Sequence, residues 1–290
     1  MKSEYVEISD ELFLKVGKLI TERYGIKMPI EKKIMFQARL QKRLRQLEMT
    51  SFDQYIAALY QGTGLTDEFE LLSDYISTNK TEFFREKAHF QFLNDVLLPS
   101  AINERILNAV DKFEIWSAGC SSGQEAYSLA IQIEEFMRKS RLRFAYSVTA
   151  TDISRRMLKQ AREAVYPMNQ ALDISLDIKQ RYLLKSKNTL EQKIKVTKEI
   201  RDKISVGYLN LMDNRYPFPN RFNAVFLRNT LIYFEHRVQV QVLEKVLECL
   251  KPGGYLFIGH SESLINLHLP IRSIAPSIYI KQTVSENDTE

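Results

Sequence analysis

The chain has few of the residues that define several protein classes. Only two of its 290 residues are cysteines, and Cys120 and Cys249 lie too far apart in sequence to form a metal-spaced set. No apolar run approaches the ~18 residues that a membrane helix needs, and the N-terminal stretch MKSEYVEISD has no apolar signal core. Ten glycines and eight prolines are too few for a fibrous or disordered chain. We therefore expect a globular, cytoplasmic protein with no disulfide framework, membrane segment or metal site.

Positive and negative charges are nearly balanced, with a net charge of +5, but the basic residues are unevenly distributed. Seven basic residues and one acid lie between positions 27 and 45. Within a helix expected over about 31–48, Arg39, Lys42 and Arg43 follow three- and four-residue steps and share a face. This face is consistent with plain solvation, with nucleic-acid binding or with an acidic protein partner, and the pattern leaves all three open.

The spacing of apolar residues divides the chain into a helical part and an alternating part. Helical periodicity covers residues 9 to about 75, without a strand pattern. Beyond residue 113 strands and helices alternate, which is typical of a doubly wound parallel sheet. We expect strands at 113–118, 144–150, 203–209, 222–228 and 254–260, helices at 124–139, 154–164 and 235–250, and two edge strands at 269–274 and 277–281.

These patterns predict an α/β fold with three segments. Residues 1–76 form a small helical domain, and residues 77–98 form a linker and connecting helix. Residues 99–284 form the sheet domain. A polar stretch at about 174–206 interrupts the alternation, and we interpret it as a small, partly β insertion.

The most informative segment joins the first predicted strand to the next helix. It reads IWSAGCSSGQEAYSLAI and carries Gly119 and Gly123 in the loop. Such a loop brings backbone N–H groups close to a ligand, and Asp152, at the end of the second strand, can accept hydrogen bonds from a ribose. A nucleoside-bearing cofactor is therefore expected. The alternative is a plain tight turn, because the loop lacks full G-x-G-x-x-G spacing.

Three other segments place polar residues where ligands tend to bind. Thr78 to Glu86 lies at the junction of the two domains and carries Asn79, Thr81 and Arg85, although Thr81 is also a plausible helix N-cap. Asn210 ends another strand, where it can contact an adenine edge or make an ordinary Asx turn. Arg228 and Asn229 interrupt an apolar run at the carboxyl end of a central strand, which favours function over core packing.

Together these motifs resemble one known family. The segments TNKTEFFRE, WSAGCSSGQEAYS, ATDIS, LNL, RNTLIYF and PGGYLFIGHSESL occur in the order found in the CheR-type chemotaxis receptor methyltransferases. The likeness extends from about Ser9 to Lys281. It implies a Rossmann-like methyltransferase domain with a small inserted β subdomain, preceded by a small all-helical domain.

The resemblance also implies a reaction and its site. Such enzymes transfer a methyl group from S-adenosylmethionine to receptor glutamates and form methyl esters. The matching cofactor contacts are Asn79, Thr81, Arg85, Glu125, Asp152, Asn210, Leu211, Asn229 and Thr230. Among them Asp152 would hold the ribose and Asn210 the adenine, while Tyr233 would lie near the transferred methyl. Arg39, Lys42 and Arg43 would face acidic receptor helices.

Some positions depart from the family pattern. Gln124 stands where a glutamate is common, Thr230 replaces an aliphatic residue, and Val206 to Tyr208 differ from the usual residues before Asn210. The insertion does not show whether it can bind a C-terminal receptor peptide, as it does in some members.

The chemistry needs no base, because a glutamate carboxylate is already anionic at neutral pH. Rate would come from positioning the carboxylate and excluding water, with Arg85, Arg228 or Tyr233 orienting it. Two other functions compete with this one. A regulator could bind S-adenosylmethionine without catalysis. A nucleic-acid methyltransferase is less favoured because no proline follows Asn229. We expect a monomer that does not bind nucleic acid.

Overall fold

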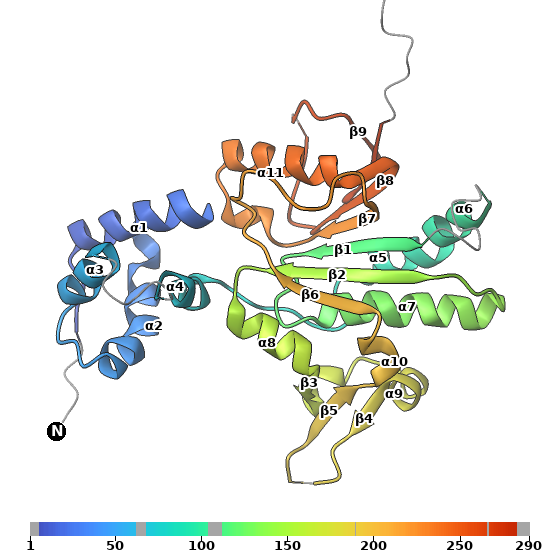
Figure 1. Ribbon diagram of the computed structural model, residues 1–290, viewed down its shortest axis with the longest axis horizontal. Coiled ribbons are helices and arrows are strands. Elements are labelled where there is room, and N and C mark those ends of the chain that lie inside the picture. The colour runs from blue at the N-terminus through green and yellow to red at the C-terminus, as the bar shows by residue number, and fades with distance from the viewer. Residues whose placement is uncertain (1–5, 62–67, 104–111, 189, 266, 283–290) are drawn as a thin grey trace, which may run out of the picture.

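A helical domain lies beside a larger sheet domain in the computed structural model (Figure 1), which describes residues 6–61, 68–103, 112–188, 190–265 and 267–282. Residues 1–5, 283 and 284, which the sequence places in the two domains, lie outside these ranges. The helical domain contains α1 (Asp10–Tyr24), η1 (Ile30–Lys32), α2 (Lys33–Gln46), α3 (Phe52–Gln61) and α4 (Glu68–Ile76). No helix in the described ranges is long and apolar enough to cross a membrane.

The helical domain has its own apolar core. Phe13, Phe36 and Tyr55 are fully buried there, and the rings of Phe13 and Phe36 meet edge to face at 5.6 Å. Ser9 caps α1 by accepting a hydrogen bond from the N–H of Leu12. Because this core is separate from those of the sheet domain, the helices form a distinct unit, as expected.

An extended junction connects this unit to a continuous helical segment made of α5 (Lys87–Phe92), the π-helical turn η2 (Leu93–Leu97) and α6 (Leu98–Asn103). The helix begins only at Lys87, after Glu86 in the left-handed conformation (φ 58°), so the alternative role of Thr81 as its N-cap is wrong. It continues past residue 98, where the connecting segment was expected to end. The reason is that Leu97 and Leu98 are buried in the core of the sheet domain.

The main sheet has the strand order β6-β2-β1-β7-β8-β10-β9. Pairing is parallel from β6 through β8, and β10 pairs antiparallel with both β8 and β9. The strands are β1 (Phe113–Ala118), β2 (Tyr146–Asp152), β6 (Ile204–Tyr208), β7 (Phe222–Leu227), β8 (Leu250–Ile258), β9 (Ile271–Ala275) and β10 (Ile278–Lys281). The predicted doubly wound α/β sheet is therefore confirmed. Several boundaries differ by one or two residues, and the largest difference is at β8. This strand starts at Leu250, and a register shift within its pairing to β7 accommodates the Pro-Gly-Gly that suggested a turn.

Helices cover both faces of this sheet, so its central strand β7 is buried along its whole length. Helices α7 (Gln124–Ser140) and α8 (Arg155–Glu163) pack beside β2 and β6, and α11 (His236–Cys249) packs beside β8. Neighbouring residues of β1 point to opposite faces: Ile115 belongs to the core with α7, and Trp116 belongs to the core with α11. Because helices cover both faces, a ligand can reach the sheet only at the ends of its strands, and in open α/β sheets ligands bind at the carboxyl ends.

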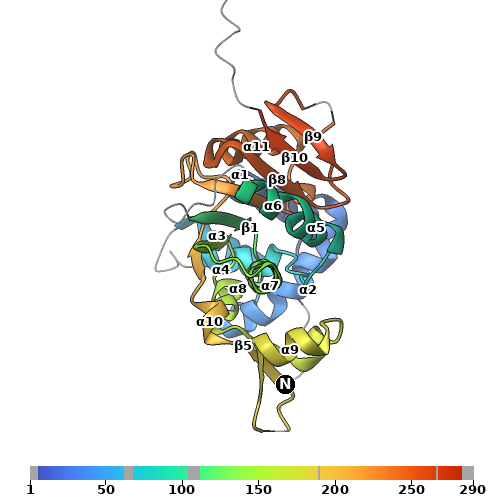
Figure 2. The same cartoon turned by 90° about the vertical axis from the view of Figure 1, so that its right-hand side faces the viewer.

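The insertion forms a second, three-stranded sheet that projects from the main one (Figures 1 and 2). Its strands, in the order β3-β5-β4, are β3 (Val165–Pro167), β5 (Lys193–Val196) and β4 (Leu183–Lys185), accompanied by η3 (Met168–Ala171), α9 (Leu176–Tyr182) and α10 (Lys198–Arg201). It therefore starts before residue 174, where the sequence placed its beginning, and residues 204–206 belong to β6 of the main sheet. A three-residue strand such as β3 is too short to produce a periodic signal.

Candidate functional site

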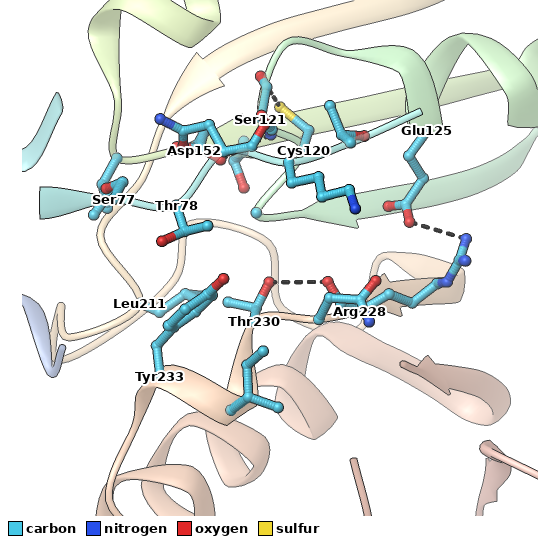
Figure 3. A pocket seen from close by; sticks show the side chains of 18 of the residues that line it. Ser77, Thr78, Cys120, Ser121, Glu125, Asp152, Leu211, Arg228, Thr230 and Tyr233 are labelled. Carbon is cyan, nitrogen blue, oxygen red and sulfur yellow. Dashed lines mark hydrogen bonds and ion pairs between the residues drawn. The ribbon is translucent and has the colours of Figure 1, made fainter. Parts of the chain in front are cut away.

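A cavity of about 240 Å³ lies at the carboxyl edge of β1, β2 and β7, where the helical domain meets the sheet. All the residues predicted to contact a cofactor line it, namely Asn79, Thr81, Arg85, Glu125, Asp152, Asn210, Leu211, Asn229 and Thr230. Arg228 and Tyr233 line it as well. Asp152 and Ser121 lie on one wall, Leu211 and Tyr233 face them, and Glu125 meets Arg228 at one end (Figure 3).

The loop after β1 approaches the opposite wall closely. Gly119 has φ 76°, and a Cβ added there would lie 2.5 Å from Oγ1 of Thr230. Gly123 has φ 93°, and a Cβ there would lie 2.9 Å from that of Ala161. The two glycines thus allow both a left-handed backbone and close packing, which a residue with a side chain would prevent. The tight turn is therefore present, and the same loop lines the cavity.

Asp152 ends β2 with its carboxylate held in place by backbone donors. The N–H of Ser121 donates to Oδ2 at 2.8 Å, and the N–H of Ser154 donates to Oδ1 at 2.9 Å. Burial raises the pKa of Asp152, while these N–H groups act in the opposite direction. The carboxylate is therefore a fixed acceptor in the cavity wall.

A charged network connects three segments at one end of the cavity. Arg228, with a side chain 1% exposed, donates from Nη1 to Glu125 at 3.2 Å and from Nε and Nη2 to Glu86 at 3.2 and 3.0 Å. Its Nη2 also donates to the carbonyl of Arg85. Glu125 accepts a further hydrogen bond from Ser117 Oγ at 2.6 Å. Burial raises the pKa of Glu125, and Arg228 is the largest influence that lowers it.

The three side chains that could orient a substrate carboxylate differ in exposure and in how many hydrogen bonds they already make within the protein. Arg228 is buried, and every nitrogen of its guanidinium is hydrogen-bonded within the protein. Arg85 is partly exposed, with one bond from Nη1 to the carbonyl of Lys80 at 3.0 Å. Tyr233 is partly exposed in the cavity wall. Arg85 and Tyr233 are thus better placed than Arg228 to meet a second ligand.

The side chains of Asn210 and Asn229 are held by the protein itself. Asn210 makes the Asx turn given as its alternative role, because Oδ1 accepts from the N–H of Met212 at 3.0 Å. Its Nδ2 donates to the carbonyl of Arg23 at 2.9 Å. Asn229 has φ 55° and donates from Nδ2 to Glu86 at 3.1 Å. Both residues therefore shape the cavity through the loops that they fix.

The basic face of α2 lies away from this cavity, and two of its residues have structural partners. Arg39 donates from Nη1 to the carbonyls of Tyr75, Ile76 and Ser77 at the end of α4, at 3.0, 3.3 and 3.1 Å. Arg43 forms a two-pronged pair with Glu68, whose side chain is 1% exposed. Lys42 is exposed.

The sequence did not reveal several residues that build the site. Tyr24 and Ile26 bring the end of α1 into the cavity wall. Glu262 accepts hydrogen bonds from the N–H groups of Asn229 at 2.9 Å and Ile232 at 3.2 Å, and so holds the loop that carries Tyr233. Glu86 lies within the junction motif, but its partners are far away in sequence. Only the motif GHSES hinted at Glu262.

Glu86, His89 and His260 bring three potential metal-ligand atoms within 4.8 Å of one another. Both oxygens of Glu86 already accept hydrogen bonds, and the Arg228 guanidinium lies 3.0 Å away, so a cation would meet a fixed positive charge. His89 is fully buried, and burial, followed by the charge of Arg228, lowers its pKa to about 4. It is therefore a neutral imidazole beneath Glu86.

The glycine loop, the acid at the end of β2 and a cavity at the carboxyl edge of a doubly wound sheet define a domain that binds a nucleoside-bearing cofactor. Two family models match the chain: the all-alpha domain of CheR methyltransferases over residues 11–77, and their SAM-binding domain over residues 79–279. The chain belongs to the CheR methyltransferase family, and its cofactor is S-adenosylmethionine.

Curated relatives are similar over almost the whole chain. The chemotaxis protein methyltransferase of Borreliella burgdorferi is 36% identical, over 95% of this chain and 96% of its own length. That of Escherichia coli is 31% identical, over 91% and 88%. Among solved structures, PKMT2 from Rickettsia typhi with AdoHcy is 14% identical, over 50% of this chain and 20% of that one, with a TM-score of 0.32.

Proposed function

We propose that this chain transfers the methyl group of S-adenosylmethionine to glutamate side chains of chemotaxis receptors and forms glutamate methyl esters. It would thus act as a protein-glutamate O-methyltransferase in the cytoplasm. The observation that carries the proposal is the convergence of the junction, the glycine loop, Asp152 and Tyr233 on one cavity. The names of the curated relatives, chemotaxis protein methyltransferases, support the choice of substrate.

The cavity suggests how the cofactor would lie. Asp152 would accept hydrogen bonds from the ribose, since its position is set by two backbone donors. Glu125 would receive the cofactor's ammonium group at the other end, beside Arg228. Adenine would be recognised by the backbone at Asn210 and Leu211, because the side chain of Asn210 is already hydrogen-bonded. Asn79, Thr81, Arg85, Asn229 and Thr230 would complete the cradle.

The transfer step would depend on positioning. The acceptor carboxylate is anionic and attacks the sulfonium methyl, with the thioether as leaving group, so no proton needs to be removed. Arg85 would pair with the acceptor carboxylate and Tyr233 would donate a hydrogen bond to it, because both side chains are partly exposed in the cavity wall. Arg228 would act indirectly, through Glu125.

The proposed receptor-binding surface is the basic face of α2, formed by Arg39, Lys42 and Arg43. Lys42 is exposed and would attract acidic receptor helices. Arg39 and Arg43 would add to the same positive field, although each also stabilises the contact between α2 and α4. We further propose that the insertion binds a receptor C-terminal peptide and that the protein is a monomer.

The test is a methylation assay with tritiated methyl-S-adenosylmethionine and a cytoplasmic receptor fragment. We expect label on the fragment that mild base releases as volatile methanol, which is diagnostic of a carboxyl ester. Base-stable label would point to another acceptor atom, and label on added RNA would favour a nucleic-acid methyltransferase. Cofactor binding without transfer would favour a non-catalytic regulator. An Asp152→Ala variant serves as the control, because it should lose transfer together with cofactor binding.

A further inference from the structure

The carboxylate of Glu86 accepts hydrogen bonds from Arg228, Asn229 and His260 close to the cavity, although Glu86 is not part of the cavity wall. One oxygen accepts from Arg228, and the other accepts from Nδ2 of Asn229 at 3.1 Å and from the N–H of His260 at 3.3 Å. The residue thereby connects the junction with the end of β7 and the loop after β8. Arg228 keeps the pKa of Glu86 below its ordinary value in spite of burial, so Glu86 is ionised at neutral pH.

Arg228 is shared between two carboxylates that have different surroundings. Its Nε and Nη2 donate to Glu86, while only Nη1 donates to Glu125, at 3.2 Å. Glu125 lines the cavity, and Glu86 does not. One guanidinium carries one positive charge, and it faces two carboxylates. When both carboxylates are ionised, these three side chains together have a net negative charge.

We propose that Glu86 is a positioning residue for cofactor binding: it holds two of the three guanidinium nitrogens of Arg228 and thereby keeps Glu125 available to the cofactor's ammonium group. The inference rests on the proposed role of Glu125. Without the Glu86 carboxylate, Arg228 is free to close a two-pronged pair with Glu125. The excess negative charge is then lost, and an ammonium group has less to bind.

The test compares two ligands that differ in the group concerned. S-adenosylhomocysteine carries the ammonium and carboxylate groups, whereas 5′-methylthioadenosine keeps the nucleoside and lacks both. By calorimetry, Glu86→Gln is expected to weaken S-adenosylhomocysteine binding about tenfold and to leave 5′-methylthioadenosine binding within about twofold. Glu86→Asp retains the charge and should lose about two- to threefold for S-adenosylhomocysteine alone.

Two further readouts separate positioning from general damage to the fold. The Glu86→Gln/Glu125→Gln double variant should bind S-adenosylhomocysteine as Glu125→Gln does, because Glu86 acts through Glu125. The acid limb of S-adenosylhomocysteine affinity should also move to lower pH in Glu86→Gln. Burial raises the pKa of Glu125 most, Arg228 and the hydrogen bond from Ser117 lower it, and the negative charge of Glu86 raises it. Removing Glu86 therefore lowers that pKa.

Glu114→Gln is the matched control, because Glu114 pairs with Arg221 at 2.9 Å at the opposite end of β1. It should leave both affinities unchanged. An unchanged affinity of Glu86→Gln for S-adenosylhomocysteine, or an equal loss for both ligands, would overturn the inference. If Glu86→Gln does not fold, the same comparison is decided by Glu86→Asp. If instead Glu125→Gln retains full affinity, the proposed role of Glu125 itself is wrong.

Discussion

The backbone N–H of Lys27 donates to the carbonyl of Tyr233 at 2.9 Å, so the segment after α1 is tied to the loop that carries a proposed catalytic side chain. A second hydrogen bond joins the last turn of α1 to the loop after β6, where Nδ2 of Asn210 donates to the carbonyl of Arg23 at 2.9 Å. The helical domain is therefore part of the cavity wall, in addition to its proposed role in receptor binding. Its docking should influence cofactor binding.

A substitution at Gly25 tests the docking of the helical domain on the sheet domain. Its φ is 73°, and an added Cβ would lie 2.7 Å from Sδ of Met212 and 2.8 Å from the ring of Phe234. We expect Gly25→Ala to lower the free energy of unfolding by about 2–4 kcal/mol and to weaken cofactor binding. Gly253→Ala is the control, since its φ is 72° but no atom lies within 4 Å of the new Cβ. It should cost only the backbone strain, about 1–2 kcal/mol, and leave cofactor affinity unchanged. Equal effects of both substitutions on affinity would contradict the docking role.

His89 should make stability depend on pH. Its pKa is about 4 in the folded protein against an ordinary value of 6.5, so the unfolded chain binds the proton more readily between these values. The contribution of His89 to the free energy of unfolding is fully present above pH 6.5. It declines as the pH falls, by about 2 kcal/mol between pH 7 and 5. His89→Phe, which preserves the edge contact with Phe257, should flatten that decline in urea unfolding series. His236→Phe, at an exposed position, should retain it. An unchanged pH slope in His89→Phe would refute the assignment.

Glu135 should hold the β subdomain against α7. Its buried carboxylate accepts hydrogen bonds from Arg138, Arg181 and Tyr182. These outweigh burial and lower its pKa to about 2. The stabilisation is therefore present above its ordinary pKa of 4.5 and is lost as the pH falls toward 2. We expect Glu135→Gln to cost about 1–3 kcal/mol at neutral pH and to speed hydrogen exchange in α9 and β4. Glu163→Gln, on an exposed residue of α8, is the control. Unchanged exchange in α9 would show that other contacts hold the subdomain.

The architecture could be predicted because its signals are local. Strand β7 is six consecutive buried residues, of which only Asn223 is polar, and a nearly continuous apolar pattern of this kind is typical of a buried parallel strand. The loop around Gly119 and the acid at Asp152 likewise lie next to the strands that position them. The beginning of the insertion was not predictable, because β3 is short and is defined only by pairing with β5, far along the chain.

The internal network of the site could not be predicted, for a related reason. Glu86, Glu125 and Arg228 are separated by long stretches of sequence and meet only when the sheet and junction assemble. Periodicity identified Arg228 as unusual in an apolar run, but it does not show whether a buried arginine binds substrate or neighbouring acids. The side chain of Asn210 is a similar case, since its partner Arg23 belongs to the other domain.

The most direct measurement is the single-turnover rate of methyl transfer to a receptor fragment, at saturating cofactor, for Arg85→Ala and Tyr233→Phe. If the cavity is the site of transfer, we expect a decrease of about 10–100-fold for Arg85→Ala and about tenfold for Tyr233→Phe. Cofactor affinity is measured in parallel, so that loss of binding is separated from loss of the chemical step. Transfer rates that both remain within about threefold of the unmodified protein would contradict the site.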